Sequence, residues 1–64
     1  MNNIMFMQKY RITEAKRLLL ESREMNITDI GFAVGYKSLS SFYEAFKSET
    51  GMKAGEFREK YFNS

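Results

Sequence analysis

Apolar residues recur at helical spacing in two consecutive segments of the stretch from Asn26 to Lys47. They are Ile27, Ile30 and Val34 in the first segment, and Leu39, Phe42 and Phe46 in the second. This spacing predicts two short amphipathic helices. Between them, Gly35 can adopt the left-handed conformation that ends a helix, and Ser38 can accept a backbone N–H bond that starts the next. A helix, a glycine turn and a capped second helix are typical of a helix-turn-helix, whose second helix enters the DNA major groove.

The segment from Ile4 to Arg23 contains neither Gly nor Pro and is predicted to form one long helix. Its apolar stripe consists of Ile12, Ala15 and Leu19, widened by Leu18. Four basic side chains of this segment could look like a DNA-contacting run: Lys9, Arg11, Lys16 and Arg17. Because Glu14 and Glu21 are interleaved with them, these residues are interpreted as a solvated helix face rather than a DNA-contacting run.

Residues near the ends of the two short helices indicate where each helix starts or stops. Asn26 is expected to cap the first short helix, and Asp29 adds a negative charge to its first turn. The second short helix is expected to run from Ser38 to about Thr50 and to stop at Gly51. Gly31 is interpreted as a small residue that lets the neighbouring helix come close.

A closing helix is predicted over residues 54–62, with Phe57 and Tyr61 turned inward and a Glu56–Lys60 pair outside. The predicted fold class is therefore all-α, a small bundle of about four helices. Residues 1–64 are expected to form one domain, divided into a first helix at 4–23, a helix-turn-helix at 26–50 and the closing helix.

The composition narrows the possible chemistry. A chain of 64 residues buries only about 60% of the surface that its unfolded form exposes, so its stability should be marginal. It has no Cys and no His, which removes disulfides, thiol nucleophiles, the usual zinc ligands and imidazole bases. Asp29 and Glu44 form no recognisable acid–base pair with the lysines. Neither an enzyme nor a cofactor or metal site is expected.

Targeting signals and the net charge say little about the function of the chain. No apolar run approaches the roughly 18 residues of a membrane span, and residues 1–7 lack the basic start of a signal peptide. A cytoplasmic protein without a membrane partner is therefore expected. The net charge of +2 permits binding to nucleic acid but does not argue for it, so the case depends on where the charges fall.

The predicted second helix offers a polar stripe. Ser40, Tyr43, Glu44 and Lys47 follow an i, i+3, i+4, i+7 spacing and share one face. Tyr43 can reach a phosphate or a thymine methyl group, whereas Glu44 can accept from a cytosine amino group or repel the DNA backbone. Lys37 and Lys47 flank the helix and suit phosphate contacts. Ser38 is expected to act first as a cap and second as a DNA contact.

Two other sets of residues allow more than one interpretation. Phe42 and Phe46 could stack on bases, but their helical spacing favours the core. Lys53, Arg58 and Lys60 could touch a flanking phosphate. For Arg58, a structural ion pair and a DNA contact remain equally good interpretations.

Beyond these patterns, the chain resembles the second helix-turn-helix of the AraC/XylS family of bacterial transcription regulators. The matching residues are Ile27-Thr28-Asp29-Ile30, Val34-Gly35-Tyr36, Ser38, Ser40, Phe42, Phe46-Lys47, Gly51 and Phe57-Arg58. The resemblance extends back to Tyr10-Arg11-Ile12 and Ala15-Lys16-Arg17-Leu18-Leu19. It implies a homeodomain-like bundle that binds specific DNA sequences as the C-terminal half of a two-unit DNA-binding domain.

The chain departs from the family pattern at several positions. Lys53-Ala54 stands where the family usually has Thr-Pro, Gly31 where it has Ala, Phe6 where it often has Tyr, and Glu44 where a basic residue is common.

The alternative function is a protein–protein interaction or self-association module, with RNA polymerase or a second copy as partner. An exposed Met and Phe patch at residues 4–7 would favour that alternative.

Overall fold

The computed structural model describes the backbone of residues 3–62 and the side chains of residues 7–62. This part of the chain forms four α-helices and no strand. They are α1 (Asn3–Glu21), α2 (Ile27–Ala33), α3 (Leu39–Thr50) and α4 (Ala54–Phe62). The all-α prediction is confirmed, although α1 ends two residues before the predicted Arg23. None of the described helices is both long and apolar enough to cross a membrane.

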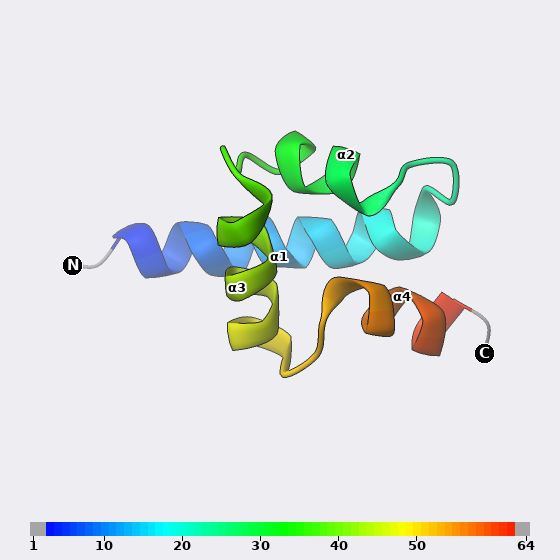
Figure 1. The fold of residues 1–64 in the computed structure, drawn as a ribbon. Coiled ribbons are helices and arrows are strands. Elements are labelled where there is room, and N and C mark those ends of the chain that lie inside the picture. Colours follow the sequence, from blue (N-terminus) through cyan, green and yellow to red (C-terminus); the bar gives the residue numbers. More distant parts are fainter. Residues whose placement is uncertain (1–2, 63–64) are drawn as a thin grey trace.

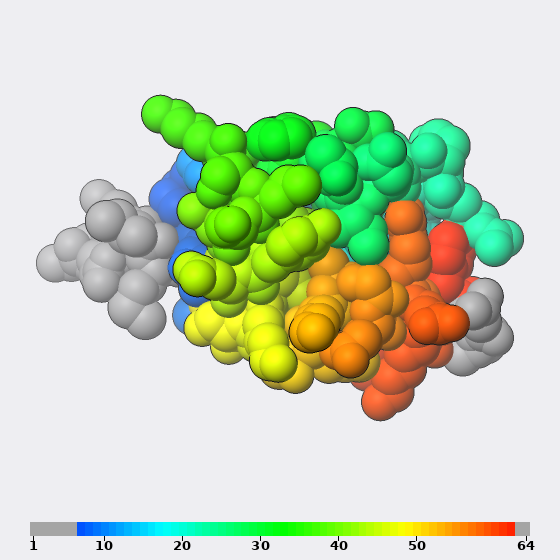
Figure 2. All heavy atoms as spheres, in the orientation of Figure 1, coloured from blue at the N-terminus to red at the C-terminus, as the bar shows by residue number. Residues whose placement is uncertain are grey.

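The three shorter helices pack around α1. In Figure 1, α2 and α4 lie on opposite sides of α1, and α3 crosses in front of it. Each of the three contacts α1, and α3 also contacts α2 and α4. Their side chains cover most of α1 in the space-filling view (Figure 2). The outward side of α3 is left as a surface of the molecule.

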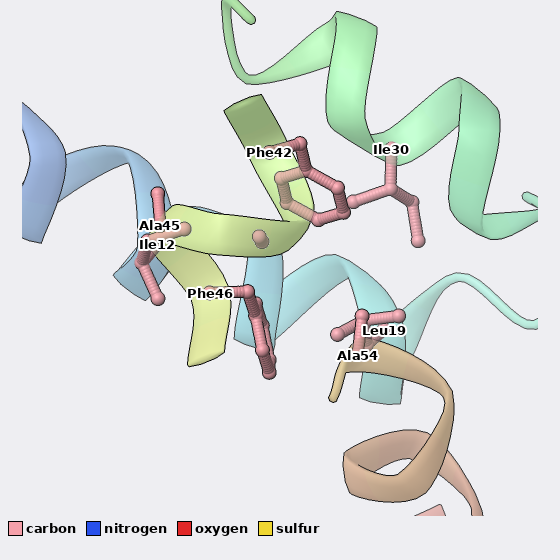
Figure 3. Close-up of a cluster of buried hydrophobic side chains, with 8 residues drawn as sticks. Ile12, Leu19, Ile30, Phe42, Ala45, Phe46 and Ala54 are labelled. Carbon is pink, nitrogen blue, oxygen red and sulfur yellow. The ribbon is translucent and has the colours of Figure 1, made fainter. Parts of the chain in front are cut away.

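The core draws residues from all four helices (Figure 3). Its buried side chains are Ile12, Ala15, Leu19, Ile30, Phe42, Ala45, Phe46 and Ala54. The predicted apolar stripes of α1 and α3 therefore face the interior. Phe42 and Phe46 are both 0% exposed, with ring centroids 5.9 Å apart. The base-stacking interpretation of these two rings is wrong, because neither ring reaches the surface.

α2 and α3 come very close at Gly31. A Cβ atom added there would lie 2.9 Å from Cδ2 of Phe42. Such a distance would force the buried ring to move. The absence of a side chain at Gly31 therefore lets Phe42 pack directly against the backbone of α2.

The local caps form as predicted. The side-chain oxygen of Asn26 accepts from the backbone N–H of Asp29 at 2.8 Å, at the start of α2. Gly51 ends α3 in the left-handed region, with φ of 79°, and its N–H donates to the carbonyl of Lys47 at 2.8 Å. These contacts satisfy backbone groups that a helix end leaves without partners.

The end of α1 has a cap that comes from far along the chain. The guanidinium of Arg58 donates to the carbonyls of Leu19 at 2.9 Å, Ser22 at 2.9 Å and Met25 at 2.8 Å. A cation is favourable there because helix carbonyls carry partial negative charge at the C-terminus. Arg58 is thus a structural residue, but its partners are backbone carbonyls rather than the carboxylate of an ion pair.

α4 differs from its prediction in two details. Tyr61 is 46% exposed instead of buried, because it lies in the last turn of α4, where its ring packs on Phe57 at 4.7 Å. The carboxylate of Glu56 accepts from the backbone N–H of Lys53 at 3.0 Å, in place of the expected contact with Lys60. The ammonium of Lys60 lies 5.5 Å from the ring centroid of Tyr61. Glu56 therefore caps its own helix, as an acidic residue in a first turn can.

Candidate nucleic-acid interface

The outward side of α3 presents the polar stripe that the spacing predicts. Ser40, Tyr43, Glu44 and Lys47 are all exposed on α3, and the ring of Tyr43 also lies 5.7 Å from that of the buried Phe42. Lys37 and Ser38, also exposed, lie in the turn that leads into α3. The structure thus brings the six predicted site residues onto one helix and the turn before it.

The turn before α3 is fixed to α1. Gly35 has a φ of 108°, a conformation that L side chains rarely adopt. Nη1 of Arg11 donates to the carbonyl of Gly35 at 3.0 Å, and the Arg11 guanidinium lies 5.7 Å from the ring centroid of Tyr36. Burial raises the pKa of the Tyr36 phenol. The ring of Tyr36 also lies 5.7 Å from that of Phe42, so the turn is held to both α1 and α3.

Ser38 has a defined structural role. Its Oγ accepts from the backbone N–H of Ser41 at 3.2 Å, and its hydroxyl donates to Oγ of Ser41 at 3.1 Å. These contacts start α3 and fix the direction in which the helix leaves the turn. The prediction that Ser38 acts first as a cap is confirmed, and a DNA contact from Ser38 stays a prediction.

All four arginines are engaged within the protein. Besides Arg11 and Arg58, Arg17 bonds to Glu14 at 2.8 Å and Glu21 at 3.1 Å, and Arg23 lies 4.2 Å from the ring centroid of Phe62. The hydrogen bonds that Arg17 donates to Glu14, and then to Glu21, raise the pKa of Arg17. The outer face of α1 is therefore a network of paired charges.

Five of the six lysines fall into two groups. Lys9 pairs with Glu49 at 3.4 Å, and Lys60 lies over Tyr61. Among the described side chains, three lysines on α3 or the turns beside it make no ion pair, hydrogen bond or ring contact: Lys37, Lys47 and Lys53. Three uncommitted ammonium groups therefore gather around α3, although the net charge of the whole chain is only +2.

A groove of about 770 Å³ lies between α3 and the start of α4. It is lined by Ile27, Tyr43, Glu44, Lys47, Lys53, Ala54, Gly55 and Glu56. In Figure 2, the atoms of α3 (green to yellow) and those at the start of α4 (orange) lie next to each other on the face toward the viewer. The groove takes in half of the predicted site residues. Sequence reasoning missed it, because its walls come from three helices.

This face has the groups needed for recognition of a polyanion. It exposes ammonium groups for phosphates, and hydroxyl, phenol and carboxylate groups that can bond base edges. In the described part of the chain, no three His, Cys, Asp or Glu side chains gather into a metal site.

Comparison with known proteins gives one match. A family model described as a helix-turn-helix domain matches residues 1–60, nearly the whole chain. No match was found among curated proteins or among solved structures. The matched range covers α1, α2 and α3 and most of α4.

Proposed function

The chain belongs to the AraC-type helix-turn-helix family, and from this premise we propose that it binds specific sequences of duplex DNA as part of a bacterial transcription regulator. The family is one of DNA-binding domains and is not enzymatic. The observation that carries the proposal is the exposed stripe on α3, a helix that also buries Phe42 and Phe46. A helix anchored in this way can enter the major groove without giving up its core contacts.

In the proposed complex, the two ends of α3 hold the DNA backbone and its middle meets the bases. Lys37 and Lys47 contact phosphates, and each contact contributes about 0.9 to the salt dependence of binding. Ser40 and Tyr43 contact base edges, Tyr43 also being able to pack on a thymine methyl group. Ser38 adds a phosphate contact while it caps the helix.

Glu44 makes the proposed interface selective. Its carboxylate can accept from the amino group of cytosine, which a suitable base sequence provides. Where no such donor is present, the same carboxylate faces phosphate groups of like charge. Both effects disfavour non-cognate DNA, so Glu44 lowers non-specific affinity more than specific affinity.

One recognition helix in one groove gives limited affinity, so the proposed regulator uses a second DNA-binding unit. In the proposed assembly, this chain is the C-terminal unit of a two-unit domain. The second unit, or a symmetric second copy, would bind about 34 Å farther along the duplex, one helical turn away. The regulator would act in the cytoplasm, where bacterial DNA is found.

The test is selection of bound sequences from a random duplex pool, followed by affinity measurements on the selected site. Lys47→Ala should weaken binding to all sequences about equally. Ser40→Ala and Glu44→Gln should change which bases are preferred, with about 1 to 3 kcal/mol of discrimination at the affected position. Glu59→Gln is the control for charge, because Glu59 is exposed on α4 outside the groove.

Two outcomes would contradict the proposal. Negligible effects of all three substitutions would show that another face binds DNA. Self-association without salt-dependent DNA binding would favour the protein–protein alternative. That alternative has one supporting observation, since Met7 and Tyr10 of α1 are 41% and 58% exposed. The side chains of residues 4–6, which complete the predicted patch, lie outside those described.

A further inference from the structure

We infer that the groove between α3 and α4 binds the sugar-phosphate backbone of a DNA strand, and that Lys53 contacts a phosphate on its α4 side. The inference rests on the proposed function and adds a surface and a residue to it. The stripe on α3 reaches only one wall of this groove, through Tyr43, Glu44 and Lys47. Lys53 also lines the groove, from the turn before α4.

The size of the groove suits an organic group rather than a single ion. Its volume of about 770 Å³ falls within the range of sites that take whole organic ligands. A Cβ added to Gly55 would lie 3.6 Å from Cδ1 of Ile27, so the starts of α2 and α4 are neighbours along this surface. The groove thus combines apolar surface, on which deoxyribose can pack, with two lysines among its lining residues.

The side chain of Lys53 has no other contact in the described structure. The start of α4 is capped by Glu56, whose Oε1 accepts from the backbone N–H of Lys53 at 3.0 Å. This bond fixes the backbone at Lys53 and leaves the ammonium group exposed to solvent. The contrast with Arg58 on the same helix is clear, because Arg58 donates to three carbonyls.

The charges that line the groove make Lys53 necessary for phosphate binding. Lys47 and Lys53 contribute two positive charges, and Glu44 and Glu56 contribute two negative ones. Without Lys53, a phosphate in the groove would meet a lining with net negative charge, which repels it. Lys53 therefore offsets the acidic Glu44 and lets a DNA strand pass beside it.

The experiment measures the affinity of the purified chain for a mixed-sequence duplex of fixed length, by fluorescence anisotropy at salt concentrations from about 50 to 200 mM. Lys53→Ala should weaken binding and lower the slope of log affinity against log salt by about 0.9. Lys53→Arg should keep the wild-type slope, because the charge is retained. Lys60→Ala is the matched control, since it removes the same charge from α4 outside the groove.

The outcomes separate the inference from the proposed function. If Lys47→Ala lowers the slope but Lys53→Ala leaves it unchanged, the inference is wrong and the proposed function stands. If Lys53→Ala and Lys60→Ala lower the slope equally, the effect is one of overall charge and the inference is again wrong. If the unmodified chain binds DNA without salt dependence, the proposed function itself fails.

Discussion

The two cation-bearing regions of this small bundle use their charges in opposite ways. Around the C-terminal end of α1, guanidinium groups are tied to the protein, with Arg58 on three carbonyls and Arg23 on the ring of Phe62. Around α3, the ammonium groups of Lys37, Lys47 and Lys53 have no partner among the described residues. The first region is held together by its cations, and the second offers its cations to a ligand.

The chemistry of the two side chains explains this division. A guanidinium has five donors in a planar fork and is weakly hydrated, so it can bond several carbonyls at once. An ammonium group is compact and strongly hydrated, and it remains in solvent until an anion replaces its water. Comparing net charges alone would miss the difference, because arginine and lysine count equally in the total of +2.

The largest expected loss of stability comes from truncating a core side chain beneath the lysine-bearing region. Phe42→Ala should cost roughly 3 to 5 kcal/mol, because a fully buried ring is lost from a small core. The total stability of such a domain is only about 3 to 10 kcal/mol, so the variant should be largely unfolded. Urea unfolding followed by circular dichroism would measure the loss.

Tyr43→Ala is the control for this substitution. Tyr43 is the next residue along α3 and is 44% exposed, so its loss should lower stability much less than that of Phe42. It should lower DNA affinity while the domain stays folded. A Tyr43→Ala variant as unstable as Phe42→Ala would contradict the separation of core and surface on this helix.

The second prediction concerns the region around the C-terminal end of α1, which arginines hold together. Arg58→Met keeps much of the aliphatic stem and leaves the carbonyls of Leu19, Ser22 and Met25 without their donor. We expect a loss of about 2 to 3 kcal/mol, since hydrogen bonds from a charged donor are strong and part-buried carbonyls are costly to leave unpaired. Lys60→Met should change stability within about 0.5 kcal/mol. Equal losses in the two variants would show that Arg58 is no special cap.

The third prediction concerns the turn between α2 and α3. Gly35→Ala should destabilise the domain by about 1 to 2 kcal/mol, because an L side chain is strained at a φ of 108°. The added Cβ would also lie 3.1 Å from Cζ of Arg11 and disturb its bond to the turn. Thermal unfolding would measure the change. Gly55→Ala should be nearly neutral, because its Cβ would make only an ordinary contact at 3.6 Å.

The smallest effect is expected at Glu49, which joins α3 to α1. The hydrogen bond from Gln8, at 2.8 Å, is the main cause that lowers the pKa of Glu49, and Lys9 adds to it. A carboxyl group whose pKa is lower in the folded state stabilises the fold at a pH above its unfolded pKa. That contribution is lost as the pH falls through the folded pKa. Glu49→Gln should therefore melt slightly lower than wild type at pH 7, and the difference should disappear in acid.

The helices and most of the core follow from local sequence. Helical spacing places Ile12, Ala15 and Leu19 on one side of α1, and all three are buried. The caps at Asn26 and Ser38 involve partners only three residues away, so the sequence alone is enough to place them. Tyr61 shows where this reasoning stops, because helical spacing gives the face of a residue but not whether a neighbouring helix covers it.

The sequence by itself determined four amphipathic helices, the caps at Asn26, Ser38 and Gly51, and the polar stripe on α3, since each depends on residues within one or two helical turns. Only the tertiary structure decided that Arg58 caps α1 from 33 to 39 residues away and that Lys53 lines the same groove as Lys47. These relations depend on how the helices pack against one another. The local sequence around Arg58 and Lys53 does not by itself decide whether each cation is paired or free.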